Sequence, residues 1–386
     1  MKNKHVVPAG KRFLGLGMNI VFAVFVFIYF YYFQSPLLSL AQHQLSEGQT
    51  EYHPLIGAIV LTMVLFVVQH KVHSYVHFRS STFALSYVPS VVLAVLPTAF
   101  TPYPNYSRLI FCFVVLLVWL ALCFGRGNFL FLSNENRKLS LGQFIGYQSF
   151  IFVFLMGFLG LCSNHTELED YEIRTSLFIQ ENKYEEALEV GKDSDVSSSL
   201  LTALRSYALT KTSTSIGEQL FHYSIPTGGS DVLYIDVSDS LKTLFDISLI
   251  YELIGVLPDK NEKPIDYFRR VAYSDSLHHS SSSDYYLCGL LLDRNLKQFV
   301  KEIPSFYDLS SFASLPRHYR EALLLAEKNG LTDMNSNYDL ELLNQYREFY
   351  HVFRFNSEVD VRMNKLYKDY SQTYWWYYYF NENRNC

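Results

Sequence analysis

Cysteine is scarce in this sequence and follows no pattern that would define a site. Three of the five cysteines lie in or beside apolar segments, where a cysteine behaves as a small hydrophobic residue. The other two, Cys288 and Cys386, are widely separated, and the C-x2-C spacing typical of zinc sites is missing. These cysteines indicate neither a disulfide framework nor a zinc site, and they leave the redox compartment open.

The chain also lacks the local motifs of several enzyme classes. It has no G-x-S-x-G elbow, the turn that presents a catalytic serine in many hydrolases. The glycine pair at 228–229 has neither the lysine nor the following helix of a phosphate-binding loop. The sequence therefore predicts no catalytic residue and no cofactor.

Charged side chains are missing from five strongly apolar stretches, all within the first 162 residues. A bilayer core about 30 Å thick is crossed by about 20 helical residues. With their flanking residues, the stretches predict a transmembrane domain over 1–162. The first stretch is too long for the core of a signal peptide, so we expect it to remain in the protein. The five expected spans are 13–33, 55–75, 82–100, 108–125 and 143–162.

The two parts of the chain carry opposite charge. Residues 1–162 contain ten Lys/Arg and three Asp/Glu, whereas residues 163–386 contain 22 Lys/Arg and 34 Asp/Glu. Basic residues cluster before the first span and in alternate connections, which predicts a cytoplasmic N-terminus and an outer domain over 163–386. That acidic domain lacks the basic surface that nucleic acid requires, so we expect the bilayer but no nucleic acid among its partners.

The expected spans contain no ionisable residue in their apolar cores, and such residues usually mark proton relays and ion-coupled transport. This favours an anchor over a transporter, although Pro89 and Pro97 could break the third span. Just after the second apolar core, His70, His73 and His77 share one helix face and are weak candidates for metal binding. No carboxylate or thiol stands beside them, so a polar collar at the membrane boundary is the alternative, and we predict no metal site.

Beyond residue 162 the apolar residues recur with helical spacing, so the fold is expected to be all-α. Ser215 and Glu218 fit a capping box, and Gly191, Gly255 and Gly330 stand where helices would stop. The expected helices are Glu167–Gln180, Tyr184–Val190, Val196–Leu209, Ser215–Tyr223, Ser238–Ile254, Pro264–Ala272, Tyr285–Leu292, Arg317–Lys328, Tyr338–Phe353 and Glu358–Tyr374.

These short helices suggest a solenoid of helix pairs. Tyr184 and Tyr319 are each followed three residues later by an alanine, the aromatic-x-x-Ala spacing of tetratricopeptide repeats. The two motifs stand 135 residues apart, close to four periods of about 34 residues. The sequence therefore predicts a helical domain similar to tetratricopeptide repeats (TPR-like).

Three segments carry a resemblance to a known group of proteins: Lys211–Tyr223, Leu315–Lys328 and the aromatic run at 374–380. With the apolar spans before them, they resemble a family of uncharacterised multi-pass membrane proteins of Bacteroidota. The resemblance implies a Gram-negative inner membrane and a periplasmic outer domain. It implies no catalytic residue, because that family has no established activity.

Seven consecutive aromatic residues form the most unusual local feature. Tyr and Trp favour the membrane–water boundary, which predicts a tail that folds back onto the membrane interface. The alternative is a last helix whose rings pack inside the helical domain. The run consists of Tyr374, Trp375, Trp376, Tyr377, Tyr378, Tyr379 and Phe380.

Taken together, the residues favour a membrane-anchored helical-repeat module that binds a protein or peptide. The first alternative is an envelope glycan transferase or ligase, which would need charged groups at the outer membrane surface to hold a lipid-linked phosphate. Arg108, Glu47, Glu51 and His53 are the candidates there. The second alternative is a transporter subunit.

Overall fold

The computed structural model divides the chain into two compact units, Met1–Thr166 and Glu167–Cys386, which are described separately here. The described part of the chain is helical, with no strand, which confirms the predicted all-α class. The structure describes residues 9–76, 80–97, 106–124, 141–163, 166–235, 242–259, 262–274, 280–332, 340–355 and 358–381.

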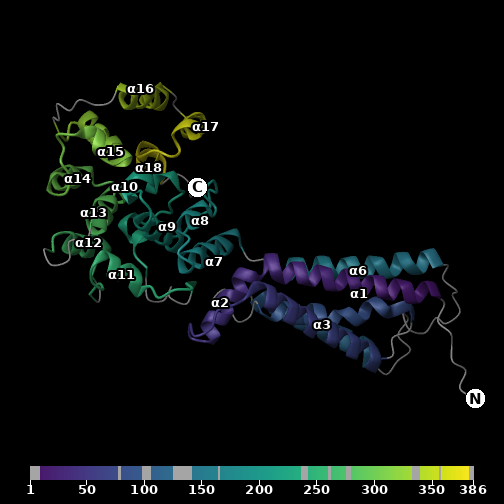
Figure 1. Ribbon diagram of the computed structural model, residues 1–386. Helices are drawn as coiled ribbons and strands as arrows, with labels where there is room; N and C mark the ends of the chain where they lie inside the picture. Colours follow the sequence, from purple (N-terminus) through teal and green to yellow (C-terminus); the bar gives the residue numbers. More distant parts are fainter. Residues whose placement is uncertain are drawn as a thin grey trace, which may run out of the picture. The chain divides into compact units, whose positions relative to one another are not determined.

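The first unit is built from long apolar helices and several shorter pieces (Figure 1). A π-helical turn, Tyr29–Phe33, continues the first helix, and a 3-10 helix, Ser80–Tyr87, leads into the fourth. The α-helices are α1 (Ala9–Ile28), α2 (Ser35–Leu45), α3 (Pro54–Val76), α4 (Val88–Val95), α5 (Tyr106–Phe124) and α6 (Leu141–Ser163).

Within the described residues of this unit, three helical stretches are long and apolar enough to cross a membrane: Phe13–Phe33, Pro54–Tyr75 and Gly142–Cys162. The prediction of five spans needs correction, because the third and fourth segments give shorter apolar helices over Phe83–Val95 and Leu109–Ala121. At 1.5 Å per residue, the eight residues of α4 cover only about 12 Å of a hydrocarbon core about 30 Å thick.

The third segment is divided because Pro89 stands in the first turn of α4. A proline fits the start of a helix but cannot donate a hydrogen bond to a preceding turn, so a 3-10 helix precedes it. α2 was not predicted at all. It begins with Pro36 in its first turn, and its residues 35–41 are buried against the unit.

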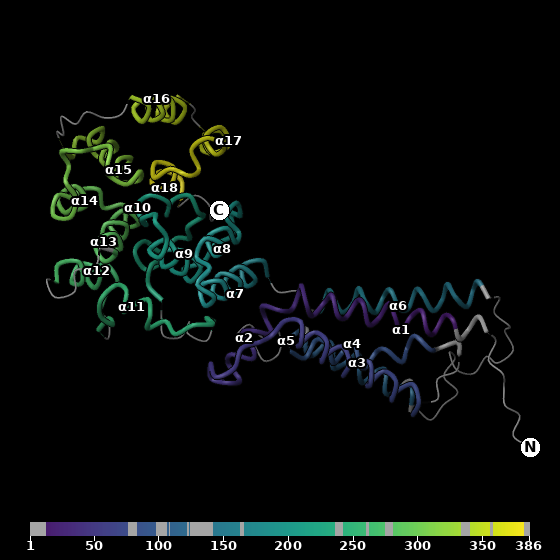
Figure 2. Tube along the Cα trace, viewed as in Figure 1, coloured from purple at the N-terminus to yellow at the C-terminus, as the bar shows by residue number. Residues whose placement is uncertain are grey.

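The second unit is built mainly from short helices (Figures 1 and 2). Its α-helices are α7 (Glu167–Gln180), α8 (Tyr184–Glu189), α9 (Ser199–Lys211), α10 (Ile216–Gln219), α11 (Ser248–Ile254), α12 (Pro264–Ala272), α13 (Ser280–Leu292), α14 (Leu296–Glu302), α15 (Arg317–Lys328), α16 (Leu340–Phe355), α17 (Val359–Tyr370) and α18 (Tyr374–Phe380). Short 3-10 helices lie at Leu220–His222, Gly229–Leu233, Ile303–Ser305 and Phe312–Ser314.

The helix predictions succeed where the signals are local. The bounds of α7, α12 and α15 are those expected, and Gly330 ends α15 in a left-handed conformation (φ 71°). The backbone amides of Gly330 and Leu331 close the last turn of the helix. Gly330 N donates to Glu327 O at 2.9 Å, and Leu331 N donates to Ala326 O at 2.9 Å. The prediction missed α14 and extended α17 to Tyr374, whereas α17 ends at Tyr370 and Tyr374 begins α18. Thr373 caps α18 by accepting a hydrogen bond from the Trp376 amide.

Candidate functional site

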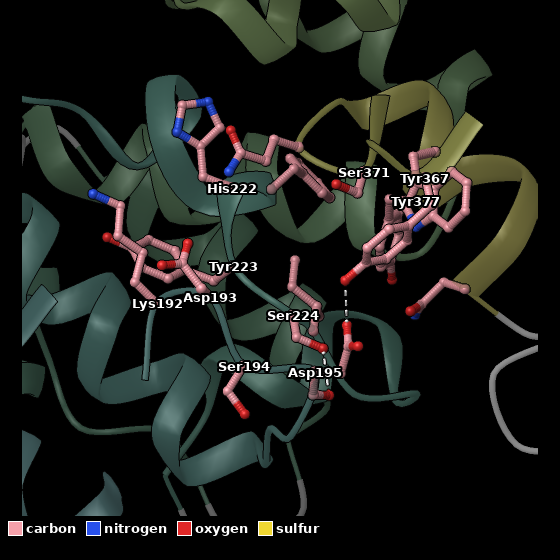
Figure 3. Close-up of a pocket in the computed structure, with 15 residues that line it drawn as sticks. Lys192, Asp193, Ser194, Asp195, His222, Tyr223, Ser224, Tyr367, Ser371 and Tyr377 are labelled. Atoms are coloured by element: carbon pink, nitrogen blue, oxygen red, sulfur yellow. Dashed lines mark hydrogen bonds between the residues drawn. The ribbon is translucent and has the colours of Figure 1, made fainter. Parts of the chain in front are cut away.

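A polar pocket of about 230 Å³ in the second unit brings together three segments that are far apart in the sequence (Figure 3). The first follows α8 and runs from Lys192 to Asp195, and the second follows α10 and runs from Phe221 to Ile225. The third comes from α17, the turn after it and α18, and includes Tyr367 and Gln372. No single sequence motif therefore marks this site.

A buried arginine positions the first segment. Arg205 of α9 is 1% exposed, and its Nη2 donates to the carbonyl oxygens of Val190 at 2.8 Å and Gly191 at 3.0 Å. Its guanidinium lies 4.7 Å from the centre of the Tyr223 ring, which lines the pocket. Burial lowers the pKa of Arg205 to about 10, and the guanidinium remains charged at neutral pH. Arg205 thus ties the loop before Lys192 to the segment that contains Tyr223.

Asp195 connects the first segment to the other two. Its carboxylate Oδ1 accepts a hydrogen bond from the Tyr367 hydroxyl at 2.8 Å, although 172 residues separate the pair. Its backbone oxygen accepts a second bond from the Ser224 hydroxyl at 2.9 Å. In Figure 3, Asp195 lies between Ser224 and Tyr367, with Lys192 and Tyr223 on the opposite side of the pocket from Tyr367. These two bonds join the three lining segments.

An ionisable cluster lies behind His222, another lining residue. The rings of His222 and His318 meet nearly at right angles, with centroids 5.2 Å apart. His318 Nδ1 lies 2.9 Å from Glu321 Oε2, and both residues are fully buried on α15. Burial, with the neighbouring His318, lowers the pKa of His222 to about 4, so His222 is neutral at pH 7.

Glu321 is the centre of this cluster. Its carboxylate also accepts bonds from Arg317 Nε at 3.0 Å and from the Tyr374 amide at 2.7 Å. Burial opposes ionisation, but the charges of His318 and Arg317 and these donors outweigh it and keep the pKa of Glu321 below its usual range. His318 does not line the pocket, so the oriented Glu321–His318 pair stabilises the protein rather than facing a ligand.

A second buried polar network ties α13 to α15. The Asp284 carboxylate accepts bonds from the hydroxyls of Tyr307 at 2.6 Å and Tyr319 at 2.7 Å. Burial raises the pKa of Asp284, although both bonds favour its ionised form. Burial also raises the pKa of the nearby Cys288 thiol well above its usual range, so this cysteine is not an activated nucleophile.

The aromatic run forms α18, and five of its seven side chains are buried. The hydroxyls of Tyr374 and Tyr377 donate to the backbone oxygens of Leu291 at 3.2 Å and Leu292 at 2.8 Å, and Trp375 Nε1 donates to Glu321 O at 2.9 Å. Protein atoms cover five of the rings, which is the packing expected of a last helix inside the helical domain, while contact of the run with a membrane interface stays a prediction. The five buried rings are Tyr374, Trp375, Trp376, Tyr377 and Phe380, whereas Tyr378 and Tyr379 are half-buried.

The weak metal candidates do not form a cluster in the described residues. His70 is exposed on α3, and the half-buried His73 ring packs edge-on against Phe83 with centroids 4.9 Å apart. His77 lies outside the described residues. Among the residues the structure describes, no group of three or more His, Cys, Asp or Glu side chains could hold a metal ion.

Sequence reasoning missed the pocket because its polar residues carry no local signature. Lys192–Asp195 reads as an ordinary charged loop, and the sequence does not show that Asp195 meets Tyr367. The only local signal was Gly191, which was expected to end α8 and has a left-handed conformation (φ 58°) immediately before the lining segment.

Residues 272–381 match the model of a family of unknown function, DUF6057. The matched stretch contains α13 to α18 and therefore the third lining segment of the pocket. The other two lining segments lie outside it. No curated protein and no solved structure matches the chain.

Proposed function

We propose that this chain is a multi-pass protein of a bacterial inner membrane in Bacteroidota, and that its helical unit binds a protein or peptide segment. In this proposal the N-terminus is cytoplasmic and the unit Glu167–Cys386 is periplasmic. The three long apolar helices support the membrane assignment, and the basic residues near the first span support the orientation.

The helical unit is proposed to be TPR-like. Ala187 and Ala322, each one turn after the tyrosine of its motif, are both fully buried. Tyr319 is fully buried as well, and Gly217 of α10 lies directly against its ring, where a Cβ would come within 2.5 Å of Tyr319 Cζ. A small residue against a wedged aromatic ring is the type of contact that lets helix pairs stack.

The observation that carries the binding proposal is the continuity of two hollows. The pocket described above shares Lys192 and Tyr223 with a second hollow of about 670 Å³ beside α8. An extended segment that passes Tyr223 would therefore contact both hollows. Their walls offer hydroxyl, amide and carboxylate groups together with tyrosine rings, a composition suited to peptide recognition.

The charge of these walls indicates a basic ligand. Glu185, Glu186 and Glu189 line the second hollow, and Asp193 and Asp195 line the first, whereas one lysine lies between them. That lysine, Lys192, is already paired with Glu189 at 2.7 Å. Complementary charge would steer a lysine- or arginine-bearing segment towards this surface.

A crosslinking experiment in cells tests this proposal. A photo-crosslinking amino acid would replace Tyr367, which is 40% exposed at the pocket, or Tyr273, which is 45% exposed but lines neither hollow. We expect a discrete protein adduct at position 367 and not at 273, with a yield that falls as salt rises. Equal adducts at both positions would refute the binding site, and capture of a lipid-linked sugar would favour the glycan-transferase alternative.

Protease treatment of spheroplasts tests the orientation separately. Protease added from outside should degrade the helical unit and leave the membrane segments protected by the bilayer. Protection of the helical unit in intact spheroplasts, with digestion after lysis, would place it in the cytoplasm and overturn the proposed topology.

A further inference from the structure

The first unit contains a groove that belongs to none of the features above. It has a volume of about 610 Å³ and lies between the C-terminal half of α2, the first turns of α3 and the end of α4. Most of its lining residues are apolar, and none carries a formal charge.

The packing of α4 against α3 places the groove at the end of α4. Two hydrogen bonds set the antiparallel register of this pair: Gln69 Nε2 donates to Ser86 Oγ at 3.1 Å, and Ser90 Oγ donates to Leu65 O at 2.9 Å. In that register the last residues of α4 face the second turn of α3. α4 ends at Val95, and α2 forms the opposite wall of the groove.

Small residues and a tyrosine ring form part of the groove wall. Ala41 of α2 and Gly57 of α3 both line it. The Tyr52 ring packs directly against Gly57, where a Cβ would come within 2.3 Å of the ring. Several larger lining residues leave much of their apolar surface uncovered by protein, including Leu45 at 72% exposed, Val60 at 51% and Leu96 at 43%.

One end of the groove has an uncharged polar rim. Gln42 Nε2 donates to Thr50 Oγ1 at 3.0 Å and to the backbone oxygen of Glu51 at 3.1 Å. The Thr50 amide donates to Ser46 Oγ at 3.2 Å. These bonds hold the turn between α2 and α3 at the mouth of the groove, and the rim offers hydrogen-bonding groups without a cation that would pair with a phosphate.

We propose that this groove binds the acyl chain of a membrane phospholipid, with the ester region of the lipid at the rim. The proposal rests on the membrane location proposed above. α3 is long and apolar enough to span a membrane, and Val60, which lines the groove, is 51% exposed, so in the proposed location the uncovered lining faces hydrocarbon. An uncharged, apolar groove in hydrocarbon is filled by a lipid chain, because water has no polar partners there.

A photolabelled lipid tests the proposal on the full-length protein. The protein would be reconstituted into phospholipid vesicles in which a fraction of the acyl chains carries a diazirine, and the labelled peptides would be identified by mass spectrometry after illumination. We expect the label to concentrate on residues 38–61 and 93–97 rather than to spread evenly over the exposed faces of α1, α3 and α6.

Two variants of α3 provide a matched comparison. Val60 and Val64 are both 51% exposed and lie one turn apart, but only Val60 lines the groove. Val60→Trp should fill the groove and remove most of the label from residues 38–61 and 93–97, whereas Val64→Trp should leave that label unchanged. Even labelling of all exposed faces, or equal effects of the two variants, would show ordinary surrounding lipid and overturn the site. Failure of the protein to enter vesicles, with no label anywhere, would instead refute the membrane location.

Discussion

Replacing Glu321 by glutamine should destabilise the helical unit, because this buried carboxylate joins α15 to α18. Glu321→Gln keeps the size of the side chain but removes its charge and turns one acceptor oxygen into a donor group. The nitrogen would then face Arg317 Nε or the pair formed by His318 Nδ1 and the Tyr374 amide, all of which now point at carboxylate oxygens. One donor or more would lose its acceptor in either orientation.

The size of the effect follows from these three contacts. Hydrogen bonds to a charged group contribute about 1.5–3 kcal/mol each, against about 0.5–1.5 kcal/mol for neutral partners. Three weakened contacts therefore amount to about 3 kcal/mol, close to the loss expected when one partner of a buried ion pair is removed. For a unit of this size, we expect the midpoint of thermal unfolding to fall by about 6–12 °C.

Tryptophan fluorescence during thermal unfolding of the detergent-solubilised full chain measures this change, since Trp375 and Trp376 are buried in α18. Glu181→Gln serves as the control, because Glu181 pairs with Lys183 at the surface. The pKa of Glu321 is lowered in the folded state, so its contribution is present above about pH 4.5 and is lost as the pH falls through the folded-state value. Equal midpoints for the two variants at pH 7 would refute the role assigned to Glu321.

Three further predictions concern residues around the pocket. The folded-state pKa of His222 is lowered to about 4, so the unfolded chain binds a proton at higher pH than the folded protein, and stability should fall as the pH drops from about 6.5 to about 4. When unfolding midpoints are measured over a series of pH values, His222→Asn should remove the fall between these two pH values. Gly217→Ala should destabilise the unit by about 1–3 kcal/mol, because the new Cβ would meet the buried Tyr319 ring at 2.5 Å. Chemical unfolding should show a smaller loss for Gly289→Ala, because the nearest atom to its Cβ would be the flexible end of Ile265 at 3.0 Å. Arg205→Met should leave the carbonyls of Val190 and Gly191 without their donor and lower the free energy of unfolding by about 1–3 kcal/mol. Limited proteolysis should then cleave faster near residues 190–195, and unchanged cleavage would contradict the positioning role of Arg205.

Local sequence signals and tertiary contacts gave different results at Ser215 and Glu218. The two residues fit a capping box, but the Ser215 side chain makes no cap hydrogen bond in the structure. The carboxylate of Glu218 instead accepts a bond from the Arg317 amide at 2.6 Å, at the start of a helix 99 residues away. The capping-box interpretation was therefore wrong, because a distant unpaired amide competes with the local one and sequence spacing does not reveal it.

The amino-acid sequence by itself determined the all-α class, the position of the apolar segments and several helix ends. These properties depend on residues close to one another in the chain, such as an uninterrupted apolar stretch or a glycine after the last turn of a helix. Pro89 was visible in the sequence as a residue that could break the third span, and in the structure it stands in the first turn of α4, directly after the 3-10 helix.

Tertiary structure alone decided where the aromatic run lies and which residues form the pocket. Seven adjacent rings are suited equally to a membrane interface and to a protein core, and their burial depends on whether α13 and α15 present carbonyl oxygens to their polar tips. The pocket likewise brings together residues such as Asp195 and Tyr367, which are 172 residues apart. Contacts of this range depend on how all the helices pack together, and no local pattern in the sequence contains that information.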